Sequence, residues 1–118
     1  MRIMSSRVHG YLDYVTVAGF ALAPSLIGLA GAPKWVCYML AGVHLLLTLL
    51  TDFPLGARPL IPLKVHGVIE FVVSIVLIVL PWVLGFSAYA AARNFFLAAG
   101  ITIFIVWLLT DYNTKVTE

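Results

Sequence analysis

Four long stretches without a charged side chain, residues 14–33, 35–51, 71–92 and 94–110, alternate with short polar segments along the chain. A helix that crosses a hydrocarbon core about 30 Å thick needs about 20 predominantly apolar residues. Because each stretch is close to that length, the pattern predicts four transmembrane helices. We expect them to form a single all-α domain over residues 1–118, an integral membrane four-helix bundle.

The two halves of the sequence carry the same motifs in the same order. Residues 7–14 read RVHGYLDY and residues 64–71 read KVHGVIEF, which pairs base, valine, histidine, glycine, acid and aromatic side chains. Farther along, LLTDF at residues 49–53 matches LLTDY at residues 108–112. We therefore expect two tandem repeats, each a helical hairpin, that enter the membrane from the same side and are parallel. The expected repeats cover about residues 7–56 and about residues 64–115.

Basic residues gather on one side of this predicted bundle. Only Lys34 and Arg93 fall on the other side. Cytoplasmic loops carry an excess of lysine and arginine, so we expect both termini and the middle loop to face the cytoplasm. The basic residues on the expected cytoplasmic side are Arg2, Arg7, Arg58, Lys64 and Lys115.

Composition supports the membrane class and narrows the partners. The chain is 63% hydrophobic and 10% charged, which lies outside the soluble globular class. A formal net charge of +2 on scattered bases does not make a nucleic-acid surface. The expected partner is the lipid bilayer, with a homo-oligomer or a larger membrane complex left open. The single cysteine, Cys37, permits no internal disulfide and is expected to be a buried small apolar residue.

One stretch of the second half resembles a known family. Residues 80–87 read LPWVLGFS, and residues 23–28 read APSLIG at the matching place in the first half. This resembles the SPW-repeat family of small bacterial membrane proteins, with Leu80 where the signature has serine. The resemblance implies a bacterial inner-membrane location and two hairpins, and it implies no activity. Residues downstream that add to it are Ala92, Asn94 and Gly100.

The repeated octad supplies the main candidate site. His9 and Asp13 are four residues apart, as are His66 and Glu70, so each pair lies on one helix face. In one interpretation the histidines converge and bind a transition metal or haem iron, each oriented by its carboxylate, while Gly10 leaves room for a flat macrocycle.

Gly67 would have the same role in the second half. In the competing interpretation the histidines lie at the membrane interface, bonded to carboxylates or lipid phosphates, while the acids pair with Arg7, Arg58 or Lys64. A duplicated gene copies structural residues as faithfully as functional ones, so the repetition alone does not decide between the two.

Three further polar residues are candidates. His44 falls inside the second apolar stretch, and its counterpart in the second half is Ile103. It is either a third metal ligand or proton acceptor, or a neutral histidine bonded to a neighbouring helix. Asp52 and Asp111 end helices where a negative charge is unfavourable. We expect them to form ion pairs with bases at the same membrane face, or else a ring at which ions enter.

The predicted ion-pair partners of Asp52 and Asp111 are Arg7 and Lys64.

Several function classes are excluded by missing motifs. The sequence has no glycine-rich phosphate loop, no cysteine cluster and no nucleophile elbow. We expect no catalytic residues and a non-enzymatic membrane protein whose histidine and carboxylate cluster binds a metal, haem or protons. The alternatives are an oligomeric channel or carrier for a small ion or solute, and an accessory or scaffolding subunit of a larger membrane complex.

Overall fold

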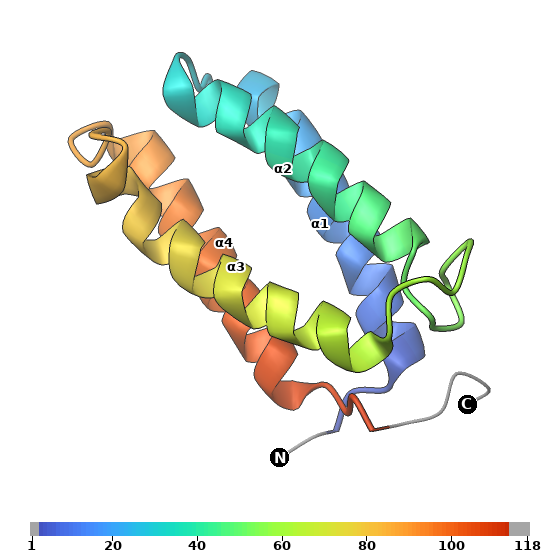
Figure 1. Ribbon diagram of the computed structural model, residues 1–118. Helices are drawn as coiled ribbons and strands as arrows, with labels where there is room; N and C mark the ends of the chain where they lie inside the picture. Colours follow the sequence, from blue (N-terminus) through green and yellow to red (C-terminus); the bar gives the residue numbers. More distant parts are fainter. Residues whose placement is uncertain (1–2, 114–118) are drawn as a thin grey trace.

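The computed structural model describes residues 3–113 and is all-helical over that range (Figure 1). Apart from two isolated bridges, the described residues form no β-structure. The helices are α1 (Ser6–Leu26), α2 (Ala32–Leu49), α3 (Leu63–Val83) and α4 (Ala90–Leu109).

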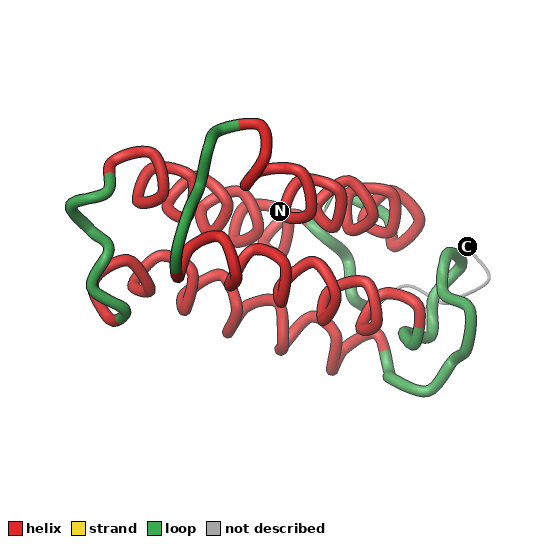
Figure 2. The backbone as a smooth tube through the Cα atoms, turned by 90° about the horizontal axis from the view of Figure 1, so that it is seen from above, coloured by secondary structure: helices red, strands yellow, loops and turns green. Residues whose placement is uncertain are grey.

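The helices form two antiparallel hairpins, α1 with α2 and α3 with α4, and the closest backbone contacts are within each hairpin. All four run along the long axis of a molecule measuring 44 × 27 × 20 Å (Figure 2). A hydrophobic core joins the hairpins, with Phe20 of α1 in ring contact with Phe95 of α4 at 5.8 Å. Cys37 belongs to this core and has no exposed surface, which confirms its prediction as a buried apolar residue.

Three of the four helices are long and apolar enough to cross a membrane: α2, α3 and α4. Large apolar side chains such as Val72 and Leu22 are exposed on the outer helix faces, as a surface that contacts lipid requires. The fourth helix, α1, has 21 residues but also carries Arg7, His9 and Asp13. The structure therefore supports a helical membrane protein, and a crossing by α1 stays a prediction.

The end of α1 differs from the expectation. The uncharged stretch reaches residue 33, but the helix stops at Leu26 because Gly28 adopts a left-handed conformation with φ of 68°. Gly85 does the same after α3, with φ of 77°. Pro24 and Pro81 lie in the last turns of their helices, and their carbonyls accept bonds from the backbone N–H groups five residues on.

One end of the molecule gathers the segments that surround the octads. Residues 3–5, 110–113 and the loop of residues 50–62 all lie there (Figure 1). Met4 pairs with the end of α4, donating to the Leu109 carbonyl and accepting from the Asp111 N–H, both at 2.9 Å. The start of α1, where the Ser5 hydroxyl accepts the Val8 N–H at 3.2 Å, is thereby held beside Thr110.

The described bases follow the expected asymmetry. Arg7, Arg58 and Lys64 belong to this end, while Lys34 and Arg93 begin helices at the other. Arg2 and Lys115 lie outside the described residues. Which end faces the cytoplasm stays a prediction.

The loop between the hairpins is tied to the end of α2. Ala57 and Arg58 donate to the Leu49 carbonyl at 2.7 and 3.0 Å, and Ile61 donates to Leu50 at 2.8 Å. Gly56 passes so close to this turn that a Cβ there would lie 2.1 Å from the carbonyl oxygen of Thr51. The turn thus requires glycine and fixes the position of Thr51.

Gly56→Ala is expected to lower the free energy of unfolding by about 1–3 kcal/mol, because the new methyl group forces the backbone at Thr51 to move. Gly42→Ala is the matched control, since a Cβ at Gly42 meets nothing within 4 Å. Unfolding of both variants in mixed detergent, followed by circular dichroism, measures the difference. Equal stability of the two variants would contradict the tight turn.

Candidate functional site

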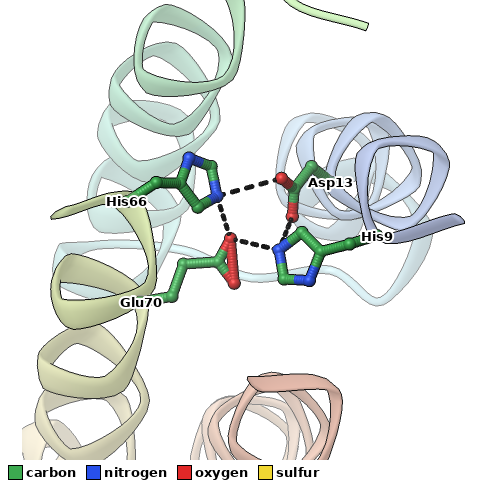
Figure 3. A group of neighbouring side chains, drawn as sticks. All are labelled: His9, Asp13, His66 and Glu70. Carbon is green, nitrogen blue, oxygen red and sulfur yellow. Dashed lines mark hydrogen bonds and ion pairs between the residues drawn. The ribbon is translucent and has the colours of Figure 1, made fainter. Parts of the chain in front are cut away.

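The octads of the two halves meet between the hairpins. His9 and Asp13 come from the first turns of α1, and His66 and Glu70 from the first turns of α3 (Figure 3). The two histidines have no exposed surface, and the acids are 3% and 2% exposed. Such burial excludes direct contact of either imidazole with lipid phosphates and shows that the octads form one internal cluster.

Each carboxylate of the cluster bridges both histidines. Oε1 of Glu70 lies 2.9 Å from Nε2 of His9 and 2.5 Å from Nε2 of His66. Asp13 faces the same two nitrogens, with Oδ1 3.1 Å from His9 and Oδ2 3.1 Å from His66. The Nε2 atoms therefore point at one centre that two carboxylates enclose (Figure 3).

Two threonines hold the outer nitrogens of the histidines. Oγ1 of Thr110 lies 2.7 Å from Nδ1 of His9, and Oγ1 of Thr51 lies 2.7 Å from Nδ1 of His66. Each threonine lies within two residues of the end of a helix, α2 for Thr51 and α4 for Thr110, in the hairpin opposite to the histidine it contacts. Sequence reasoning missed these residues, although the repeated LLTD motif contained them.

His44 approaches the cluster from α2 without joining its centre. Its Nε2 is 3.5 Å from Oδ1 of Asp13 and, among the described residues, has no hydrogen-bond partner. The four residues whose ligand atoms lie close together are His9, Asp13, His66 and Glu70. A role for His44 as a third ligand is therefore still a prediction.

The glycines of the octads make room for aromatic rings. A Cβ at Gly10 would lie 2.7 Å from the Phe53 ring, and one at Gly67 would lie 3.0 Å from the Tyr112 ring. These rings also contact the histidines, Phe53 against His66 at 5.9 Å and Tyr112 against His9 at 5.6 Å between centroids. The space expected for a macrocycle is thus filled by side chains.

The cavity next to the cluster is also too small for haem. It has a volume of about 10 Å³, roughly what one water molecule needs, and Asp13, His44 and Glu70 line it. The histidine rings themselves lie 5.5 Å apart and nearly perpendicular, at 77°. The structure therefore has no room for a macrocycle at this cluster.

The cluster has the composition of a transition-metal site. One ligand atom from each of the four residues can be chosen so that all lie within 4.8 Å of one another. Two imidazole nitrogens and two carboxylate oxygens suit Zn²⁺ and neighbouring first-row ions, whereas Mg²⁺ and Ca²⁺ prefer oxygen alone. The remaining nitrogen of each histidine already has its threonine partner, as metal-bound histidines usually require.

The acids of the cluster pair with histidines and not with bases. The ion pairs among the described residues all join Asp13 or Glu70 to a histidine. The interpretation in which these acids pair with Arg7, Arg58 or Lys64 is therefore not seen in the described part of the chain.

The ion pairs predicted for Asp52 and Asp111 at the helix ends have different outcomes. Arg7 and Lys64 are exposed, and within residues 3–113 neither forms an ion pair with Asp52. Asp111 accepts a hydrogen bond from the N–H of Asn113 at 3.0 Å, and its predicted ion pair stays a prediction.

Comparisons with known proteins do not assign the chain to a family. No family model matches the sequence, and no curated protein and no solved structure matches it either. The geometry of the cluster is therefore the main guide to the function of this chain.

Proposed function

We propose that this chain is a membrane protein that binds one divalent transition-metal ion, of the Zn²⁺ class, between its two hairpins. The ligands are Nε2 of His9, Nε2 of His66 and one oxygen each of Asp13 and Glu70. The observation that carries the proposal is that these four ligand atoms lie within 4.8 Å of one another in a buried site.

The ligand atoms would have to rearrange when the ion binds. Zinc bonds of about 2.0–2.2 Å to nitrogen and oxygen place the ligand atoms of a tetrahedral site about 3.3 Å apart. The nitrogen–oxygen separations here are 2.9 and 3.1 Å for His9 and 2.5 and 3.1 Å for His66, and the two contacts of Asp13 use different oxygens. Separations among the four ligand atoms reach up to 4.8 Å, so binding would open the short nitrogen–oxygen contacts and draw the widest pair together.

Occupancy of this site would also hold the hairpins together. Glu70 reaches across to His9, and Asp13 reaches across to His66, so each carboxylate links α1 to α3. Other polar links between the hairpins include the threonine contacts to the histidines and the Met4 bonds to the end of α4, and lipid gives no hydrophobic drive for helix association. A bound ion would therefore stabilise one relative position of the hairpins.

Metal titration of the purified protein tests the proposal. After chelator treatment in mild detergent, one Zn²⁺ or Co²⁺ is expected to bind per chain, and Co²⁺ should give the visible absorption of a tetrahedral N/O site. His9→Ala with His66→Ala should abolish binding while helical circular dichroism persists. Asp52→Asn, outside the cluster, is the control and should bind like the wild type. Binding that survives the double substitution would refute the site.

The remaining expectations follow from the sequence and are part of the proposal. They place the protein in the bacterial inner membrane with both termini in the cytoplasm, in the SPW-repeat class, where it either acts alone or docks to a larger complex.

Transport is the second candidate function, because a groove leads toward the cluster. The groove, about 200 Å³ between α1 and α4, shares Thr16, Thr102 and Ile103 with the small cavity beside Asp13. Metal flux into liposomes, lost in Asp13→Asn, would favour a carrier over a static metal site.

A further inference from the structure

The two threonine hydroxyls that contact the histidines also bond to backbone carbonyls of their own helices. Thr51 Oγ1 lies 2.6 Å from the Leu47 carbonyl oxygen, and Thr110 Oγ1 lies 2.6 Å from that of Val106. A hydroxyl has one proton, so each threonine donates either to the carbonyl or to Nδ1 of its histidine. The choice decides which nitrogen of each histidine is free.

The threonine hydroxyl protons are more strongly required by the carbonyls of Leu47 and Val106, which have lost their helical donors. In a continuing helix the Leu47 carbonyl would accept the Thr51 N–H, but that group bonds to Thr48 at 3.4 Å because the helix ends. The Thr110 N–H likewise bonds to the Trp107 carbonyl at 3.3 Å, which leaves the Val106 carbonyl without its helical N–H donor. Since buried carbonyls are almost always paired, the hydroxyl protons belong to the carbonyls. A further acceptor near Thr110, the Met4 sulfur at 3.6 Å, is weak.

The charge of the buried cluster favours the same arrangement. If each Nδ1 carries a proton, the second proton between each Nε2 and its carboxylate makes the two histidines and two acids neutral in sum. If the threonines donate to Nδ1 instead, the same four residues carry two negative charges. His44, 3.5 Å from Asp13, can offset at most one of them. Uncompensated charge in a buried intramembrane site is costly.

We infer that Thr51 and Thr110 are positioning residues that hold Nδ1–H on His66 and His9, so that both histidines offer only Nε2 to the ion. Each hairpin thereby supplies the residue that orients the other hairpin's ligand. The inference deepens the proposed metal site and rests on it for its purpose, but the proton positions are testable without metal.

Nitrogen NMR of the histidines tests the inference directly. In protein labelled with ¹⁵N-histidine, two-bond ¹⁵N–¹H correlations distinguish Nδ1–H from Nε2–H. With Zn²⁺ bound, His9 and His66 are expected as Nδ1–H with Nε2 on the metal. Without metal, both should still carry the Nδ1 proton. A neutral Nε2–H form of either histidine in the metal-free wild type would overturn the inference.

Substitution of the threonines separates a positioning role from a structural one. Thr51→Val should change the signals of His66 alone, Thr110→Val those of His9 alone, and each should weaken Zn²⁺ binding about 10- to 100-fold. Thr51→Ser keeps the hydroxyl, so its His66 signals and its Zn²⁺ affinity should match those of the wild type. Thr48→Val is the matched control, because Thr48 is equally buried and its hydroxyl bonds to the His44 carbonyl at 2.8 Å.

The outcomes of these experiments distinguish the two proposals. If both histidines carry Nδ1 protons but the protein binds no Zn²⁺, the metal site is refuted and the positioning role of the threonines is still supported. If the wild type binds Zn²⁺ but Thr51→Val and Thr110→Val leave the histidine signals unchanged, the metal site is supported and the positioning role of the threonines is refuted.

Discussion

Glu70→Ala is expected to lower the free energy of unfolding by about 3–5 kcal/mol, the usual cost of removing one partner from a buried ion pair. Oε1 of Glu70 is shared by His9 at 2.9 Å and His66 at 2.5 Å, and the acid is 2% exposed. Its loss leaves two buried imidazoles with Asp13 as their remaining acidic partner. Detergent-induced unfolding followed by tryptophan fluorescence measures the change.

Two further variants make this result specific. Glu70→Gln keeps the volume and an oxygen acceptor, so we expect a smaller loss than for alanine. Asp52→Ala removes a half-buried acid that lies outside the cluster, and its effect should stay within about 0.5 kcal/mol. If Asp52→Ala costs as much as Glu70→Ala, the cluster is not the main polar link between the hairpins.

The histidine cluster was partly predictable from the sequence. The spacing of four residues places His9 beside Asp13 and His66 beside Glu70 on any helix. Whether the pairs meet depends on α1 lying next to α3, and apolar periodicity does not determine which helices are neighbours. The structure supplies that contact through the link of Asp13 to His66 and of Glu70 to His9.

The glycines of the octads and the LLTD motifs could each be explained in two ways from the sequence. Gly10 and Gly67 indicated a close approach, but a missing Cβ accommodates a flat ligand or an aromatic ring equally well, and the rings belong to Phe53 and Tyr112. The LLTD motifs drew attention to their acids, whereas the threonines make the contact with the site. A helical threonine ordinarily bonds its own preceding turn, so only three-dimensional structure reveals the histidine partner.

The extent of α1 shows why an uncharged stretch is not the same as a helix. Residues 14–33 contain no charge, yet α1 begins earlier, at Ser6, and ends earlier, at Leu26. Its start depends on the Ser5 cap and its end on the left-handed Gly28, both of them local backbone features. Hydrophobicity thus located the segment, and turn chemistry set its limits.

Binding of one divalent ion is expected to release about two protons and to leave the charge of the cluster unchanged. In the metal-free protein a proton lies between each Nε2 and a carboxylate oxygen, as the hydrogen-bond distances of 2.9 Å for His9 and 2.5 Å for His66 require. The ion takes the nitrogen lone pairs and the carboxylate oxygens together, so both protons leave.

This exchange sets the direction of the pH dependence. Because two protons compete with one ion, affinity should fall by a factor of about 100 for each unit by which the pH is lowered, over the range where both protons are bound. Titration of Zn²⁺ into weakly buffered protein with a pH indicator counts the protons directly. A release of zero would mean that the histidines carry their protons on Nε2 and pass them to Nδ1 on binding, in which case the threonines donate to the histidines. A release of two protons indicates that Nδ1 was already protonated. It would also explain how the site can be buried, because the exchange of two protons for one divalent ion adds no net charge to the membrane interior.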